Sequence, residues 1–560
     1  MKFTHHKCVT LSLITLAFLS SFSAQSAPAA PDAGQTSREL QKQPNLNTPK
    51  SVAPVRVEGD TAKGAVEDGL RIAIKAIRIS GNSVFATDVL ESLVVDLIRG
   101  ERSLAELDAG AARITAYYRE RGYVVARAYL PAQDIKDGAV EIRVLEGQIG
   151  DQSINNGSRL SEGQVNKYTK DIKHGDAVQS GRIDRAVLLL SDTPGVGGAR
   201  ATLQPGASVG TSDLLIEVDP AAPYAANIEA DNYGNRYTGE YRLGATLALN
   251  SPLKIGDQLT VRALASNENL IYGRLAYQLP VGSSGLRLGG AYSETHYELA
   301  KEFASIKAHG SARSASLFTT YPFVRSQTSN LYGTLTGEYK DLLDKTDVPV
   351  SSVDKQVRLI NFGMAGSHRD VLGGAGITSV DTALIFGHLN MDVASLAIDA
   401  TTARSEGGFA RFTYNLNRLQ RVTAADSLSI TVSGQQASKN LNSSEKFTLG
   451  GANGVRAYPQ GEGNGDDGWL ANLELRHNFL DNLQAIAFYD AGGVNINHTA
   501  YSTATNTRNI AGAGVGLNAQ YKLFQLKTSI SWRTHGGQAQ TEPTTMDRSP
   551  RLWVQLNGTF

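Results

Sequence analysis

The chain has 560 residues, which is more than one ordinary globular core organises, so several domains are expected. Lysine and arginine together number 54, and aspartate and glutamate also number 54, so the formal net charge is zero. This balance suggests neither a nucleic-acid partner, which selects basic surfaces, nor a strongly acidic partner.

The first residues have the pattern of a secretory signal peptide. Lys2 and Lys7 precede an apolar run from Val9 to Phe22, and a stretch of small residues follows this run. We expect cleavage near Ser26, so that residues 1–26 are removed. A membrane anchor is the alternative, but the run is shorter than the roughly 20 residues that a helical span needs.

Cysteine usage and hydropathy narrow the architecture further. The only cysteine, Cys8, lies before the apolar run, whereas a lipoprotein cysteine would follow that run. The mature chain is therefore expected to lack disulfides, and its soluble parts must rely on hydrophobic cores. No later stretch approaches the roughly 18 uninterrupted apolar residues of a helical span, so a membrane role requires a closed barrel.

Residues 27–70 are rich in proline, alanine, glutamine and asparagine, which is the composition of a linker. Within them, the segment from Gln35 to Gln43 is compatible with a short polar helix that Thr36 or Ser37 would cap. This segment lacks an apolar stripe and is too short to be stable alone, so disorder is the alternative.

Two small α+β units are predicted next, over residues 71–147 and 148–220. The first has the order β-α-α-β-β, with elements expected at 72–79, 89–97, 104–118, 124–129 and 140–144. The second has helices expected at 162–172 and 182–190 and strands expected at 199–203 and 214–218. The likeness between them is one of pattern rather than of residues, so the internal repeat is weak. Small units of this kind leave sheet edges open.

Residues 221–560 alternate between short strands and polar turns. The closing segment places Leu552, Val554, Leu556 and Phe560 on one side and Trp553, Gln555, Asn557 and Thr559 on the other. One face can meet lipid and the other a wet lumen, which is typical of an outer-membrane β-barrel. At roughly 21 residues for each strand and connection, the segment accommodates about 16 antiparallel strands. A soluble β-solenoid or sandwich array is the alternative. Long external loops are expected at 341–355, 498–509 and 535–549.

Motifs for catalysis or cofactor binding are weak. The chain has no phosphate-binding Gly-Lys-Ser/Thr loop, no His-Glu-x-x-His motif, and only scattered histidines, so neither a cofactor nor a metal is expected. Gly512, Gly514 and Gly516 lack dinucleotide-binding spacing, and packing explains them better. Asp466 and Asp467 fit a hydrated turn better than a cation site. No credible Ser/His/Asp arrangement points to an enzyme.

The densest motif is a glycine-rich segment followed by a strand motif. A loop this rich in glycine can fold sharply and enter a narrow space. Here the chain resembles the outer-membrane transporters of two-partner secretion (the TpsB family of ShlB-, FhaC- and HecB-like proteins), within the Omp85 superfamily that includes the barrel-assembly insertases. The Val-Arg-Gly-Tyr tetrad on the family's sixth external loop is matched by Val455, Arg456, Ala457 and Tyr458, and the family's Phe-x-Asp strand motif by Phe488 and Asp490.

The resemblance covers nearly the whole chain through short fragments, each of them weak alone. They include Gly81-Asn82, Glu146-Gly147, Pro194-Gly195-Val196 and Asp231-Asn232-Tyr233-Gly234. Ala457 is the main departure, because the family usually has glycine there. If that position requires a positive φ, alanine costs roughly 1 kcal/mol.

Physical reasoning about the arginine agrees with the resemblance. An arginine on a loop folded into a lumen needs a partner, and Asp490 offers Arg456 a charge-assisted hydrogen bond worth roughly 1.5–3 kcal/mol before solvent screening. Such a lock would hold the loop and still break during transport. The alternative is that Arg456 is one of many solvated loop arginines.

The resemblance implies a non-enzymatic transporter that exports an exoprotein of the haemolysin or adhesin type across the outer membrane of a Gram-negative cell. The two small units would be periplasmic POTRA domains that receive the unfolded client, and the barrel over 221–560 would conduct it. The segment near Gln35–Gln43 would plug the barrel at rest. The barrel-assembly machinery would insert the chain into outer-membrane lipid.

Three other functions remain as rivals. An insertase shares the superfamily motif, but its usual members carry more POTRA units, and only two fit before Ala221. A passive porin or receptor barrel would have no use for the two periplasmic units. An outer-membrane hydrolase would need a catalytic arrangement that the sequence does not offer.

Overall fold

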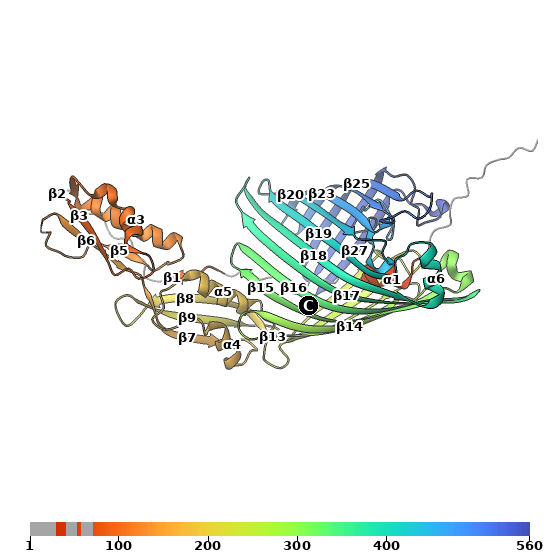
Figure 1. The fold of residues 1–560 in the computed structure, drawn as a ribbon, viewed down its shortest axis with the longest axis horizontal. Coiled ribbons are helices and arrows are strands. Elements are labelled where there is room, and N and C mark those ends of the chain that lie inside the picture. Colours follow the sequence, from red (N-terminus) through yellow and green to blue (C-terminus); the bar gives the residue numbers. More distant parts are fainter. Residues whose placement is uncertain (1–29, 41–52, 58–70, 136) are drawn as a thin grey trace, which may run out of the picture.

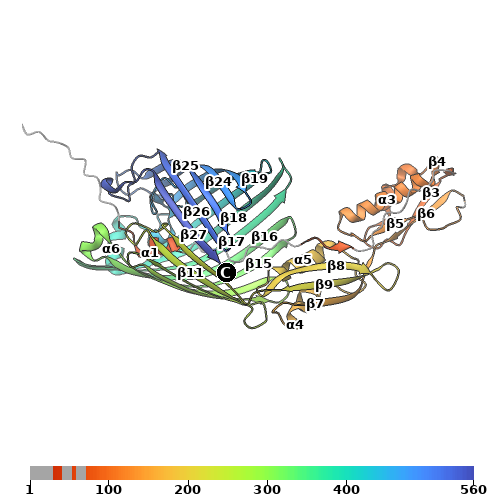
Figure 2. The same cartoon turned by 180° about the vertical axis from the view of Figure 1, so that it is seen from behind.

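The protein is described by a computed structural model that covers residues 30–40, 53–57, 71–135 and 137–560. Two small α+β units lead in line to a large closed barrel (Figures 1 and 2). The expected signal peptide at 1–26 and much of the expected linker lie outside the described residues. Within the described ranges, no helix has the length and hydropathy of a membrane span.

The first unit packs one long helix on a three-stranded sheet with the order β3-β6-β5. Its elements are β2 (Arg71–Ala73), β3 (Ala76–Ser80), α2 (Thr87–Ser92), η1 (Val95–Leu97), β4 (Glu101–Ser103), α3 (Leu104–Glu120), β5 (Arg127–Tyr129) and β6 (Ala139–Leu145). The strand expected over 72–79 is divided in two, because β2 pairs with β4 whereas β3 pairs in parallel with β6. Helix α3 begins with a capping box between Ser103 and Glu106.

In the first unit, a buried carboxylate joins the segment after β3 to helix α3. Glu146 accepts hydrogen bonds from the backbone N–H groups of Ser83 and Val84, both at 2.8 Å, and from the Tyr118 hydroxyl at 2.7 Å. Burial alone would raise the pKa of this carboxyl, but the hydrogen bonds from Ser83 and Tyr118 bring that pKa below its ordinary value. The glycine that follows, Gly147, has φ +75° and turns the chain into the second unit.

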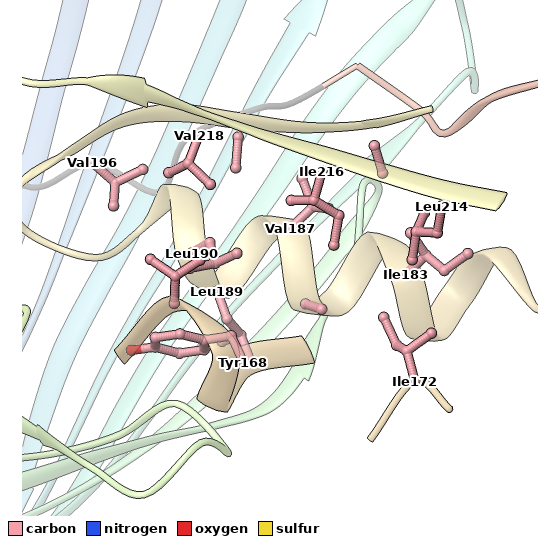
Figure 3. Packing of buried hydrophobic residues seen from close by; sticks show 14 of the residues in the cluster. Tyr168, Ile172, Ile183, Val187, Leu189, Leu190, Val196, Leu214, Ile216 and Val218 are labelled. Carbon is pink, nitrogen blue, oxygen red and sulfur yellow. The ribbon is translucent and has the colours of Figure 1, made fainter. Parts of the chain in front are cut away.

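The second unit has a four-stranded sheet with the order β1-β8-β9-β7. Its elements are β7 (Gln148–Asn156), α4 (Glu162–Thr169), α5 (Ser180–Ser191), β8 (Val196–Pro205) and β9 (Thr211–Pro220), and the edge strand β1 (Arg56–Val57) comes from the linker. Figure 3 shows Ile183 and Val187 of α5 beside Leu214 and Ile216 of β9, in a cluster that also holds Leu190. The sequence alone predicted neither β7 nor β1.

The rest of the chain forms a closed barrel of sixteen antiparallel strands, which confirms the predicted fold class. The strands are β10 (Tyr224–Asp231), β11 (Arg242–Asn250), β12 (Gln258–Ser266), β13 (Ile271–Val281), β14 (Leu286–Glu298), β15 (His309–Arg325), β16 (Ser329–Asp347), β17 (Val350–Asp370), β18 (Ala375–Met391), β19 (Gly407–Arg421), β20 (Asp426–Ala437), β23 (Asp467–Leu480), β24 (Leu483–Asn495), β25 (Thr507–Tyr521), β26 (Phe524–His535) and β27 (Arg551–Thr559). Pairing of β10 with β27 closes the ring. The connections also carry η2 (Lys301–Ile306), α6 (Val393–Thr401), η3 (Ser443–Glu445) and η4 (Thr544–Met546).

Side chains alternate between an apolar outer face and a polar lumen. On β11, Leu243 and Leu247 are 61% and 41% exposed on the outside, whereas Thr246 lies buried inside. The prediction of a long external loop at 341–355 is wrong, because β16 and β17 continue as a paired hairpin through this polar stretch. Their 19 and 21 residues carry the ladder beyond the apolar band, where backbone pairing remains available to polar residues.

The second unit is anchored to the barrel by charged contacts near the end of α5. Asp192 accepts two hydrogen bonds from Arg325 of β15, at 2.6 and 2.9 Å. Its backbone carbonyl accepts a third from Arg287 at 2.7 Å. Arg185 donates to the carbonyl of Pro322 at 2.8 Å. The orientation of the second unit against this end of the barrel is therefore set by several hydrogen bonds rather than by a single linker.

Candidate functional site: a loop held inside the barrel

The connection between β20 and β23, residues 438–466, folds back into the barrel, and we call it the inward loop. A short hairpin of β21 (Phe447–Thr448) and β22 (Asn464–Gly465) forms its base. Val455, Ala457 and Tyr458 at its tip are 0%, 1% and 0% exposed. Glycines allow this fold: a Cβ on Gly454 would lie 1.9 Å from the Leu449 carbonyl oxygen.

Arg456, at the tip of the inward loop, contacts Asp490 on the lumen face of β24. The guanidinium donates two hydrogen bonds to the carboxylate, both at 2.8 Å, and the backbone N–H donates a third at 3.1 Å. Asp490 is fully buried, and Phe488 shares its face of the strand. The structure thus brings together the two residues expected to form the lock, in the bidentate geometry that favours arginine over lysine.

A second carboxylate and an aromatic ring complete the surroundings of the guanidinium. Glu474 of β23 accepts a hydrogen bond from Arg456 at 2.8 Å. The ring centroid of Phe488 lies 3.4 Å from the guanidinium carbon, in a cation–π contact. The sequence alone predicted Phe488 but not Glu474. The alternation of β23, which places Glu474 on the polar face, is the pattern that could have indicated it.

The backbone at the loop tip is also fixed. The carbonyl oxygen of Arg456 accepts hydrogen bonds from the Ser531 hydroxyl and the Trp553 indole N–H, both at 2.7 Å. Asn472 donates to Asp490 at 2.8 Å and to the Gly454 carbonyl at 3.1 Å. These partners come from β23, β26 and β27, so the loop tip touches strands on both sides of β24.

Ala457 fits the site without backbone strain. Its φ is not among the positive values of the chain, so the condition under which alanine would be unfavourable is not met. Its methyl group instead packs against Gly512 of β25, where an added Cβ would lie 2.3 Å away. Gly514 likewise leaves room for the Phe488 ring. Packing therefore explains the spaced glycines of β25.

Farther from the tip, a carboxylate of the inward loop itself ties the loop to neighbouring segments. Glu462 is fully buried and pairs with Arg508 of β25 at 2.7 Å. It also accepts hydrogen bonds from the backbone N–H groups of Gln540 and Thr541, at 2.9 and 3.0 Å. The Tyr458 hydroxyl donates to the carbonyl of His535 at 2.7 Å. The loop is thus joined to the connection between β26 and β27.

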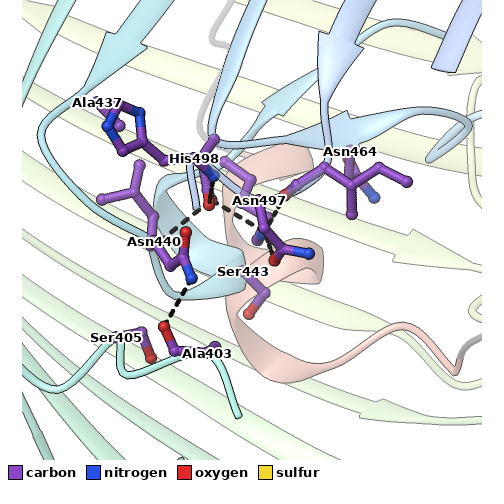
Figure 4. A network of polar contacts seen from close by, with 12 residues as sticks. Ala403, Ser405, Ala437, Asn440, Ser443, Asn464, Asn497 and His498 are labelled. Carbon is purple, nitrogen blue, oxygen red and sulfur yellow. Dashed lines mark hydrogen bonds and ion pairs between the residues drawn. The ribbon is translucent and has the colours of Figure 1, made fainter. Parts of the chain in front are cut away.

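A third polar cluster lies at the base of the inward loop (Figure 4). The Asn440 side chain donates to the carbonyl of Ala403 at 2.7 Å and accepts from the Thr499 N–H at 2.7 Å. Asp466, which is fully buried, pairs with Lys446 at 2.9 Å. These contacts connect three external segments above the lumen.

A short helix from the linker also lies inside the barrel, where Figure 1 shows it beside these segments. Helix α1 spans Ala33–Leu40 and so begins before the helix expected near Gln35–Gln43, of which residues 41–43 lie outside the described residues. The carboxylate of Asp32 caps the helix by accepting a hydrogen bond from the Gln35 N–H at 2.9 Å. The prediction that Thr36 or Ser37 caps it is therefore wrong. The earlier start makes Asp32 the preceding residue, and Thr36 and Ser37 are buried within the helix.

Helix α1 is attached directly to the base of the inward loop. Arg38 donates to Thr448 at 2.6 Å, to Asn464 at 2.9 Å, and to the carbonyl of Lys446. The Ala33 N–H donates to Asp344 of β16 at 2.8 Å. A polar cavity of about 1050 Å³ remains in the lumen beside the helix and the loop. Both segments therefore occupy a lumen that also retains room for water.

No metal centre is apparent in the part of the chain that the structure describes, where no three His, Cys, Asp or Glu side chains are grouped as ligands. The buried carboxylates of the lumen have cationic partners instead. Glu445, for example, pairs with Lys340 at 2.8 Å and Arg411 at 2.7 Å. The chemistry of the lumen is thus that of ion pairs.

Comparisons with known proteins agree with this geometry. The family model "Haemolysin secretion/activation protein ShlB/FhaC/HecB" matches residues 210–519, and the model "POTRA domain, ShlB-type" matches residues 72–147. The heme/hemopexin transporter protein HuxB of Haemophilus influenzae is 27% identical over 534 residues, which cover 92% of this chain and 94% of HuxB. The hemolysin transporter protein ShlB of Serratia marcescens is 26% identical over 445 residues, or 75% of each chain.

Solved structures share the fold at lower sequence identity. CdiB from Escherichia coli superposes with a TM-score of 0.73 at 18% identity, over 94% of this chain and 96% of CdiB. BamA from Haemophilus ducreyi, lacking POTRA domains 1–3, reaches a TM-score of 0.50 at 12% identity, over 88% of this chain. At these identities the likeness concerns the fold alone.

Proposed function

This chain belongs to the haemolysin secretion/activation family of ShlB, FhaC and HecB, and we propose that its inward loop is the breakable lock of an exoprotein-conducting barrel. The family consists of two-partner secretion transporters of the outer membrane, in which POTRA domains stand in the periplasm. The chain accordingly moves a partner exoprotein from periplasm to cell surface. No catalytic step is part of this proposal.

The contact between Arg456 and Asp490 carries the proposal. The pair is buried at rest, and its hydrogen bonds would be exchanged for bonds to water once the loop leaves the wall of the lumen. A hydrogen bond to a charged group contributes about 1.5–3 kcal/mol net, which is modest beside the free energy of folding of a whole domain. A loop held in this way is fixed at rest and can still move when a client chain enters.

The position of helix α1 in the lumen supports a role as a plug of the resting barrel. The helix contacts Asp344 of the wall and Thr448 of the inward loop through hydrogen bonds, and Ala33 and Leu40 pack in an apolar cluster inside the barrel. We propose that α1 and the inward loop together obstruct the lumen at rest. Folding of the exported chain outside the cell would supply the driving force, since the periplasm offers no nucleotide.

The client is proposed to be a secreted protein of the haemolysin or adhesin class. Two relatives are named as transporters of hemolysin and of heme/hemopexin, which indicates the range of cargo among similar proteins. We propose that the client docks in extended form by adding a strand to a POTRA sheet edge, because main-chain bonds place modest demands on sequence. Lipid would surround the apolar outer face, and the barrel-assembly machinery would insert the chain.

Deletion of this gene tests the function. Export of one partner predicts that a single large polypeptide disappears from the medium, while the other outer-membrane proteins remain at normal levels. A general loss of barrel proteins would instead favour an insertase. Unchanged secretion with loss of small-solute uptake would favour a passive porin. Expression of the intact gene from a plasmid is the control.

A further inference from the structure

Our further inference concerns the edge of the second unit's sheet and rests on the proposed function. We infer that β1 is a place-holder on β8, and that an extended segment of the exported chain displaces it when the client docks. The client would then pair with β8 through main-chain hydrogen bonds. In the resting protein, β1 would keep this edge closed.

The position of β1 supports this inference first. Arg56 pairs with Thr202 and Val57 with Leu203, in parallel orientation. In the sheet order β1-β8-β9-β7, β1 is the outer neighbour of β8 (Figures 1 and 2). An uncovered edge strand is a template for pairing with any extended chain, and proteins commonly cover such edges. The linker therefore supplies the cover for β8.

The side chains of β1 define the chemistry that fits this edge. Val55 and Val57 pack against the core of the second unit, whereas Arg56 is exposed. The Val55 N–H donates a hydrogen bond to the carboxylate of Asp184 on α5. Apolar side chains at alternate positions thus face the core while the one between them faces solvent. We assign to this edge a partner of the same kind, an extended segment with apolar residues at every second position.

The short length of β1 makes it displaceable. It pairs with two residues of β8, which is ten residues long. An incoming strand that paired along more of β8 would form more ladder hydrogen bonds, each with a net contribution of about 0.5–1.5 kcal/mol. A longer client segment would therefore replace β1, whereas a short or irregular peptide would not.

A disulfide between β1 and β8 tests the displacement in the full chain. Because Cys8 is the only native cysteine and lies in the expected signal peptide, Arg56→Cys with Thr202→Cys has no competing thiol. These residues are direct partners, so their spacing suits a disulfide. The probe is the polypeptide that deletion of this gene removes from the medium. Its secretion should fall about tenfold or more when the pair is oxidised and recover on reduction.

A matched pair controls for the disulfide itself. Arg200 and Glu217 are direct partners on β8 and β9, two strands that the inference does not require to separate. Arg200→Cys with Glu217→Cys should secrete normally when oxidised, as should each single variant of the β1–β8 pair. Normal secretion by the oxidised β1–β8 pair would overturn the inference, as would failure of that disulfide to form.

A binding measurement separates this inference from the proposed function. The probe is a fluorescent synthetic peptide of residues 50–60, added to the full chain in detergent micelles. Binding should tighten about tenfold when Val57→Asp weakens native β1, and it should vanish in the oxidised β1–β8 pair. Equal binding to all three proteins would overturn the inference. If no polypeptide leaves the medium on gene deletion, the proposed function fails, while this binding result still decides whether β1 covers the edge.

Discussion

The tip of the inward loop and the core of the second unit are both buried, but charged groups take part in holding the loop tip and not the core. Around Arg456 ion pairs to Asp490 and Glu474 stand beside an apolar cluster that includes Val455 and Tyr458. In the second unit, Leu190 and Ile216 are fully buried among other aliphatic side chains (Figure 3). The two regions thus differ in the share of charged contacts that holds them.

The difference follows from what water can replace. Exposing apolar surface costs about 25 cal/mol for each Å², and water offers no compensating interaction. A hydrogen-bonded loop in a wet lumen regains bonds to water when it moves, so its net cost is lower. We therefore expect substitutions in the lumen to change transport and substitutions in the periplasmic units to change stability.

The largest effect is expected from Arg456→Ala. This change leaves the buried carboxylate of Asp490 without its cation, which should abolish secretion while the barrel still assembles. Secretion of the client and heat-modifiability of the barrel measure the two outcomes. Arg313→Ala is the matched control, because its pair with Glu294 is exposed. Normal export by Arg456→Ala would contradict the lock.

Asp490→Ala should behave similarly but with losses that are only partly additive. Glu474 still accepts from Arg456 in that variant, so some loop contact remains. Secretion by both single variants and the double variant would measure the coupling. Full additivity would indicate that Arg456 and Asp490 act independently, against the proposed pair.

Removal of the plug should have a smaller but measurable effect on the resting channel. Deletion of residues 33–40 removes α1 from the lumen and should raise single-channel conductance in planar bilayers by about twofold or more. Arg38→Ala, which removes the hydrogen bonds to Thr448 and Asn464, should give a partial increase. A conductance that stays unchanged after the deletion would refute the plug.

In the second unit, a core truncation should destabilise without touching the lumen. Leu190→Ala should lower the free energy of unfolding by about 2–5 kcal/mol, because the side chain is fully buried. Hydrogen exchange of α5 in the full chain measures the loss. Val209→Ala, at a residue that is 94% exposed, should change protection little. Protection of α5 that survives Leu190→Ala would count against an aliphatic core as the source of stability.

The smallest effect is expected at Glu146 in the first unit. Glu146→Gln should lower the free energy of unfolding by about 1–3 kcal/mol at neutral pH. Because the pKa of Glu146 lies below its ordinary value of 4.5, its contribution is present above that pH and is lost as the pH falls through the lowered pKa. Urea midpoints at pH 7 and pH 4 should therefore differ less in the variant. An equal acid dependence in both proteins would exclude this role.

The sequence reached the fold class because alternation is local. The pattern of Leu552 to Thr559 requires only that neighbouring side chains point in opposite directions, and the closed barrel confirms it. The association of Arg456 with Asp490 was accessible through a motif. Glu474, Ser531 and Trp553 were not, because they reach the loop tip from strands far apart in the chain.

The periodicity of the strands, the two α+β units and the need of Arg456 for a charged partner could all be predicted from the sequence. The path of the linker could not be predicted, because α1 lies in the lumen and β1 pairs with the edge of β8 only in the folded chain. The physical reason is that both segments are too short to be stable alone, so their conformation depends on the surface that receives them.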